Sequence, residues 1–141
     1  MFTQSCFIRK NTPELREKLE EFGYISHIFN NNDANNIYVD KFGTYISVDI
    51  ENQPYYIDCG TNEELFLALA ALRDDTPINS YYWFNDNLFK CEGLEIDRVL
   101  KNNTANYLLK CRHVDNSMII SCFKERNIRK ATIEEIVEHF K

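Results

Sequence analysis

Three helices are predicted where apolar residues recur every three to four positions. They span residues 12–22, 61–72 and 132–140. The middle one is apolar on almost every side from Leu65 to Leu72, so we expect neighbouring elements to bury it. Each of these segments begins with a threonine that is expected to act as the N-cap of the helix, at positions 12, 61 and 132.

Shorter segments with alternating or continuous apolar residues predict β-strands, several of them joined as hairpins. The predicted strands span residues 4–9, 24–29, 37–40, 44–50, 55–59, 78–84, 88–91, 107–114 and 117–124. The Asn-rich segment 30–36 predicts a polar loop. No linker is long enough to divide the chain. The pattern therefore predicts one globular α+β domain over residues 1–141, with a mostly antiparallel or mixed sheet built from hairpins and three helices, the middle one buried.

Composition supports a folded domain and narrows the class of protein. At 141 residues with 44% hydrophobic and 27% charged residues, the chain can bury a sizeable core. The longest apolar run, Leu65 to Leu72, is too short to span a membrane, and no apolar signal segment follows Met1. Five cysteines, an odd number without a Cys-x-x-Cys pair, indicate reduced thiols. We therefore expect a cytoplasmic protein without a membrane partner.

Charge disfavours a nucleic-acid partner. The net charge is −6, whereas sequence-independent binding to nucleic acid needs many Lys and Arg contacts with phosphates. Residues 1–100 hold 8 basic and 17 acidic residues, and residues 101–141 hold 8 basic and 5 acidic residues. The basic residues are thus relatively enriched near the C-terminus.

A repeated triplet, Ile-Arg-Lys, marks the candidate binding site. It occurs at residues 8–10 and 128–130, each time two residues before a predicted cap threonine. Helix N-termini attract anions, so neighbouring cations could hold a phosphate or a carboxylate. The alternative is that these side chains are solvated and balance acidic neighbours. No Gly-rich phosphate-binding loop accompanies them. The candidate anion-binding residues are Arg9, Lys10, Arg126, Arg129 and Lys130.

Aromatic residues offer a second candidate contact. In a strand over residues 78–84, Tyr81 and Trp83 share one face, while Tyr82 and Phe84 share the other. Tyr81 and Trp83 could stack on a nucleobase. The alternative, packing of one face in the core and of the other beneath a loop, is more common for such strands.

Cysteine and histidine residues offer two further readings. Cys111, His113 and Cys122 share a hairpin face, but a fourth zinc ligand at a diagnostic spacing is missing, so core burial is favoured. Cys59 lies just before a helix N-terminus, which would stabilise a thiolate, but no His is recognisably its base. We therefore predict no catalytic residues, no metal and no cofactor.

Three segments, residues 6–24, 57–75 and 129–140, resemble small uncharacterised proteins of phages and mobile elements of gut bacteria. This resemblance implies a binding role, including inhibition of host defence. We expect a small non-catalytic cytoplasmic binding protein that acts on a host protein or sequesters a small anionic, nucleotide-like ligand. The alternatives are a small thiol- or carboxylate-based enzyme and a structural or assembly component of a phage particle.

Overall fold

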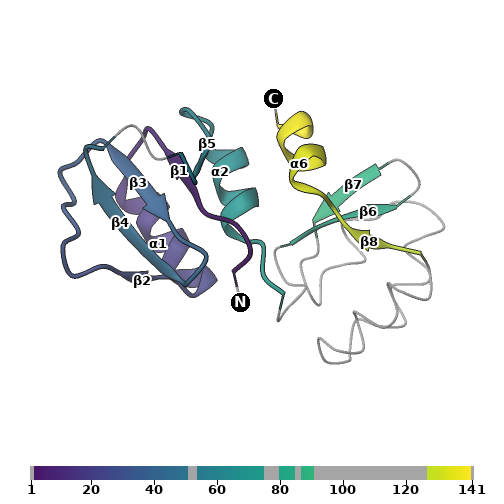
Figure 1. The fold of residues 1–141 in the computed structure, drawn as a ribbon, viewed down its shortest axis with the longest axis horizontal. Coiled ribbons are helices and arrows are strands. Elements are labelled where there is room, and N and C mark those ends of the chain that lie inside the picture. Colours follow the sequence, from purple (N-terminus) through teal and green to yellow (C-terminus); the bar gives the residue numbers. More distant parts are fainter. Residues whose placement is uncertain (1, 51–53, 75–79, 85–86, 91–126, 141) are drawn as a thin grey trace. The chain divides into compact units, whose positions relative to one another are not determined.

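The structure, a computed structural model, describes residues 2–50, 54–74, 80–84, 87–90 and 127–140 (Figure 1). The chain forms two compact units: unit 1 comprises Met1–Leu72 with Phe140–Lys141, and unit 2 comprises Arg73–His139. Helices and mixed sheets confirm the predicted α+β class. The single domain stays a prediction, because two units can belong to one domain. None of the helices in the described ranges has the length and apolar character that crossing a bilayer requires.

Unit 1 contains a five-stranded mixed sheet with the strand order β2-β4-β3-β1-β5. β1 pairs antiparallel with β3, and β3 pairs antiparallel with β4, which confirms the hairpin predicted between residues 37 and 50. The outer pairs, β1 with β5 and β2 with β4, are parallel. The strands are β1 (Cys6–Ile8), β2 (Ile25–Ser26), β3 (Asn36–Val39), β4 (Thr44–Val48) and β5 (Ile57–Asp58).

Two helices of unit 1 follow the predicted apolar pattern. α1 (Pro13–Phe22) begins after Thr12, whose hydroxyl accepts a hydrogen bond from the Leu15 amide at 3.2 Å. It ends at Gly23, whose φ of 108° is strained for other residues. The cap of α2 (Glu63–Ala70) differs from the prediction, because Asn62 and not the threonine before it is the N-cap. The buried helix residues are Leu15, Leu19, Phe22, Leu65, Phe66, Ala68, Leu69 and Ala70.

The helices of unit 1 cover one face of its sheet. Tyr45 on β4 donates a hydrogen bond to Glu20 of α1 at 2.8 Å, and the Cys6 thiol on β1 lies 4.0 Å from the Phe66 carbonyl oxygen of α2. In Figure 1, α1 lies behind β3 and β4. Because side chains alternate along a strand, the residues next to Cys6 and Tyr45 face away from the helices.

Unit 2 contains a three-stranded sheet and a short helix. β6 (Tyr81–Phe84) pairs antiparallel with both β7 (Asn87–Lys90) and β8 (Arg129–Lys130). The β6–β7 hairpin confirms the prediction, although β7 begins one residue earlier than expected. α6 (Ile133–His139) follows β8. Outside the described residues lie the hairpin predicted over 107–124, with Cys111, His113 and Cys122, and also Cys91 and Arg126.

Candidate functional site

The face of the unit 1 sheet that points away from α1 and α2 carries mainly aromatic and aliphatic side chains. The register aligns Phe7 with Tyr38, and Tyr38 with Ile46, across β1, β3 and β4. Val48 lies two residues after Ile46 and therefore shares its face. We call this side of the sheet the helix-free face, defined by Phe7 and Tyr38, which are buried, and by Ile46 and Val48, which are half-buried. Ile25 on β2 points to the same side of the sheet, because it aligns with Thr44 of β4, and Thr44 lies two residues before Ile46.

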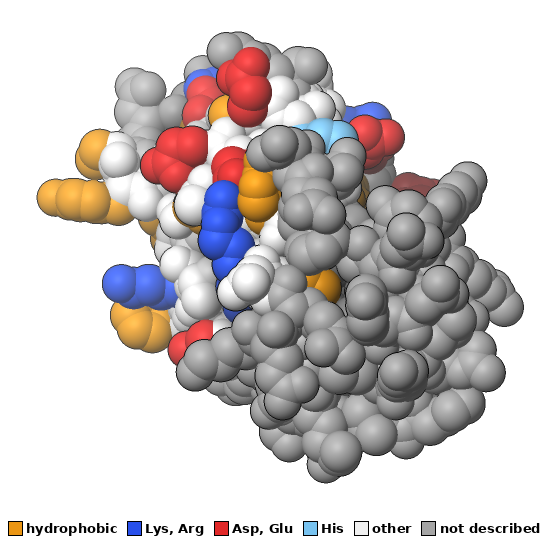
Figure 2. Space-filling model, turned by 90° about the vertical axis from the view of Figure 1, so that its right-hand side faces the viewer, with side chains coloured by type: hydrophobic (Ala, Val, Ile, Leu, Met, Phe, Trp, Pro, Cys, Tyr) orange, Lys and Arg blue, Asp and Glu red, His pale blue; other side chains and the backbone are white. Residues whose placement is uncertain are grey.

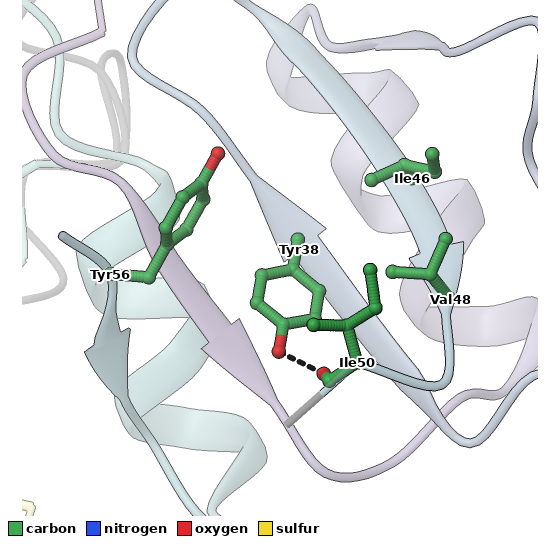
Figure 3. A pocket seen from close by; sticks show the side chains of 5 residues that line it. All are labelled: Tyr38, Ile46, Val48, Ile50 and Tyr56. Atoms are coloured by element: carbon green, nitrogen blue, oxygen red, sulfur yellow. Dashed lines mark hydrogen bonds between the residues drawn. The ribbon is translucent and has the colours of Figure 1, made fainter. Parts of the chain in front are cut away.

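A hollow of about 180 Å³ opens on the helix-free face. Its wall is mostly apolar, and the Tyr38 ring lies between Tyr56 and the aliphatic side chains of the wall (Figure 3). The Tyr38 hydroxyl donates a hydrogen bond to the Ile50 carbonyl oxygen, which fixes the ring on this side. The residues that line the hollow are Tyr38, Ile46, Val48, Ile50 and Tyr56.

Aromatic contacts hold the Tyr38 ring on its other sides. Phe7 stacks on Tyr38 with ring centroids 4.7 Å apart, and Tyr56 meets Tyr38 edge-on at 5.3 Å. Phe7 and Tyr38 are buried, so these contacts belong to the folded core of unit 1. The Tyr38 ring at the hollow is therefore held in place by Phe7, Tyr56 and the Ile50 carbonyl.

The Tyr56 hydroxyl is the polar group of the hollow wall that remains available. It makes no hydrogen bond to any residue in the described part of the chain. Burial and the nearby Asp40 carboxylate raise the pKa of Tyr56, so the hydroxyl stays protonated at neutral pH. It can therefore donate a hydrogen bond to an incoming acceptor.

Large hydrophobic side chains are exposed around β2. We call Ile25, Ile28, Phe29 and Phe42 the apolar patch; their exposed fractions are 70%, 87%, 74% and 81%. The Ile25 amide donates to the Gly43 carbonyl at 2.9 Å, which brings β2 beside the residue that follows Phe42. Ile28 and Phe29 form the turn directly after β2. Hydrophobic side chains project from the described surface in Figure 2. Exposed large hydrophobic side chains that lie near one another in a soluble protein are candidates for an interaction site.

The predicted cations of unit 1 already have acidic partners. Arg9 lies 2.9 Å from Asp58 and 5.3 Å from the Phe7 ring, and its hydrogen bond lowers the pKa of Asp58. Lys10 lies 3.2 Å from Glu63. An anion at this junction would have to compete with both carboxylates.

The cations of unit 2 are engaged in the same way. Arg129 donates two hydrogen bonds to Glu135, each 2.8 Å long, and lowers the pKa of Glu135 to about 2. Lys130 donates from its ammonium group to the Arg73 carbonyl oxygen. Glu135 and Thr132 also cap the first turn of α6 reciprocally. Arg9, Lys10 and Arg129 thus lie in ion pairs, and Lys130 bonds to a backbone carbonyl. Anion binding by these residues stays a prediction.

The predicted aromatic contact is partly occupied. Tyr82 is buried, whereas Tyr81 and Trp83 on the opposite side of β6 are half-buried, as strand alternation requires. The Arg129 guanidinium lies 5.7 Å from the centre of the Trp83 ring. Stacking of Tyr81 and Trp83 on a nucleobase stays a prediction.

The two described thiols lie in the core. Cys6 and Cys59 are both buried, and burial, with a hydrogen bond between the two thiols, raises the pKa of Cys6. A raised pKa keeps this thiol protonated and weakly nucleophilic. Within the described ranges, no group of three or more His, Cys, Asp or Glu residues is placed to hold a metal ion.

No protein-family model, curated protein or solved structure matches the chain. The residues of the hollow were not singled out from the sequence. Alternation in residues 44–50 places Ile46 and Val48 on one side of a strand, which is a usable signal. It does not show that Tyr38 and Tyr56 come to lie beside them.

Proposed function

We propose that the chain is a non-catalytic binding protein that engages a protein partner through the helix-free face and the apolar patch of unit 1. The observation that carries this proposal is the exposure of four large hydrophobic side chains, between 70% and 87%, around one short edge strand. Side chains of this size present on the order of 500 Å² of apolar surface together. A standard interface buries about 800 Å² per partner, so the patch would supply its apolar centre.

The pairing of the cations favours a protein partner over a small anion. Arg9, Lys10 and Arg129 each lie within 3.2 Å of a carboxylate oxygen of Asp58, Glu63 or Glu135. A phosphate would have to compete with a carboxylate at each of these cations, which offsets part of its electrostatic gain. A host protein is the partner that the resemblance to phage proteins suggests, and the proposed setting is the host cytoplasm.

We expect small anions to leave the melting temperature of the protein unchanged. Phosphate, nucleotides and cyclic nucleotides at about 10 mM should shift it by less than about 1 °C, whereas a ligand with a Kd near 1 mM would stabilise the native state by about 1.4 kcal/mol. The measurement is a thermal-shift series with sodium chloride at matched ionic strength as the control. A shift of several degrees that disappears in Arg9→Ala or Arg129→Ala would instead support anion sequestration.

Removing part of the apolar patch is expected to weaken partner binding at least about tenfold. The double variant Ile28→Ser/Phe29→Ser removes two of the most exposed hydrophobic side chains, and central apolar residues carry about 1–2 kcal/mol or more each at interfaces. Partners captured by the immobilised wild-type chain from a bacterial lysate would be quantified by mass spectrometry. Binding of the purified partner would then be titrated.

The matched control is Tyr55→Ser. Tyr55 is 88% exposed, and it lies beside β5, at the other edge of the sheet from β2. Both variants change only exposed side chains, so each should alter the free energy of unfolding by less than about 0.5 kcal/mol per site. Equal partner binding by wild type and the double variant would contradict the proposed function.

A further inference from the structure

We propose that the hollow on the helix-free face is an anchor pocket that accepts one aromatic side chain of the size of Phe from the protein partner. This inference rests on the proposed function, because it assigns the central contact of the same docking surface. Three observations carry it: the size of the hollow, the chemistry of its wall, and the exposure of the aliphatic side chains that line it.

Size restricts the occupant to a single ring. The hollow measures about 180 Å³. A dry apolar cavity of about 150 Å³ accepts benzene, whereas sites for drug-sized ligands measure about 300–1,000 Å³. One phenyl ring therefore fits, but a nucleotide or another ligand of several rings does not.

The wall of the hollow suits an aromatic ring that is attached to a peptide. Ile46, Val48 and Ile50 supply aliphatic contacts, and the rings of Tyr38 and Tyr56 supply faces and edges for an aromatic pair. The Tyr38 hydroxyl is already bound to the Ile50 carbonyl, but the Tyr56 hydroxyl has no partner in the described part of the chain. It is placed to donate to a backbone carbonyl beside the anchor.

The surroundings favour a protein as the source of the ring. Ile50, at the wall of the hollow, is half exposed, and Ile46 and Val48 beside it are half-buried. A free aromatic molecule would leave much of the Ile50 side chain in water. A protein that inserts one ring would cover this side chain as well, which is the usual arrangement of a buried anchor surrounded by contacts that exclude water.

The test uses N-acetyl-phenylalanine amide as the probe and the full ¹⁵N-labelled chain as the target. Titration followed by NMR should give saturable shifts for the amides of residues 46–50 and 56, and N-acetyl-alanine amide should give none. Val48→Phe, which places a ring in the hollow, should weaken probe binding at least fivefold. Tyr56→Phe, which keeps the shape and removes the hydroxyl, should weaken it about threefold. Glu17→Gln, at an exposed position of α1 outside the hollow and the apolar patch, should leave it unchanged. The amide spectra of the variants report whether each remains folded.

Three results would overturn the anchor pocket. The first is the absence of saturable shifts up to the solubility limit of the probe. The second is binding of phenol as tight as binding of the probe, which would assign the hollow to a free ring. The third is a concentration-dependent dimer that Val48→Phe disperses, which would assign it to a second copy of the chain. If the probe fails but Ile28→Ser/Phe29→Ser still weakens partner binding at least about tenfold, the proposed docking surface is supported and only the anchor pocket is wrong.

Discussion

Replacing Phe66 with alanine is expected to lower the free energy of unfolding by about 3–5 kcal/mol. Phe66 lies on α2, has no exposed surface, and is one of the largest fully buried side chains in the described part of the chain. Its carbonyl oxygen lies 4.0 Å from the Cys6 thiol of β1, so this turn of α2 packs against a central strand of the sheet. The truncation removes the transfer free energy of the ring and leaves a cavity that close-packed neighbours fill only in part.

Urea denaturation followed by circular dichroism measures this loss, with Phe42→Ala as the control. Phe42 is the same residue type but is 81% exposed, so its truncation should change stability by less than about 0.5 kcal/mol. If units 1 and 2 unfold in separate transitions, the loss should appear in the transition of unit 1. A loss below about 1 kcal/mol for Phe66→Ala would show that α2 does not hold the sheet together.

The sequence predicts those elements of unit 1 whose signals are local. The alternation in residues 37–50 predicts the hairpin of β3 and β4 because consecutive side chains of a strand fall on opposite faces. The spacing of Leu15, Leu19 and Phe22 predicts α1 and its buried stripe, all three of which are buried. Both signals depend on residues within one or two turns of the chain.

Pairing between distant strands could not be predicted in this way. β1 lies between β3 and β5, so Phe7 meets Tyr38 and Asp58, residues 31 and 51 positions away. A short apolar strand such as Cys6–Ile8 fits many neighbours equally well, and its neighbours are selected by packing of the whole core. The hollow joins side chains from three segments, so its existence depends on this pairing.

The roles of the cations depend on distant residues as well. Arg9 is recognisable in a repeated triplet, but Asp58, which pairs with it at 2.9 Å, lies 49 residues away. Glu135 lies six residues from Arg129, and it also caps α6. The basic triplet before a helix predicts an anion site, and this stays a prediction. The sequence pattern does not show that folding brings carboxylates to the same cations.

The N-cap of α2 is Asn62, whereas the sequence pattern predicts Thr61. Asn62→Ala is expected to lower the free energy of unfolding by about 2 kcal/mol. The Asn62 side chain accepts a hydrogen bond from the Leu65 amide at 3.1 Å and donates one to the Phe140 carbonyl at 2.6 Å. Loss of an N-cap costs about 1 kcal/mol, and loss of a second hydrogen bond costs about 1 kcal/mol more. Chemical denaturation of Asn62→Ala and of wild type measures this difference in the free energy of unfolding.

The control is Thr61→Ala, which removes the cap that the sequence pattern predicts. Thr61 is exposed and precedes the observed cap, so its truncation should cost less than about 0.5 kcal/mol. Asn62→Ser keeps an acceptor for the Leu65 amide but cannot reach Phe140 as Asn does, so it should restore about half of the loss. If Thr61→Ala were the more destabilising variant, α2 would begin one residue earlier. The N-cap also lies just after β5, so it helps to position the connection between this edge strand and α2. We therefore expect Asn62→Ala to broaden the amide signal of Tyr56, which directly precedes β5, in NMR spectra of the ¹⁵N-labelled chain.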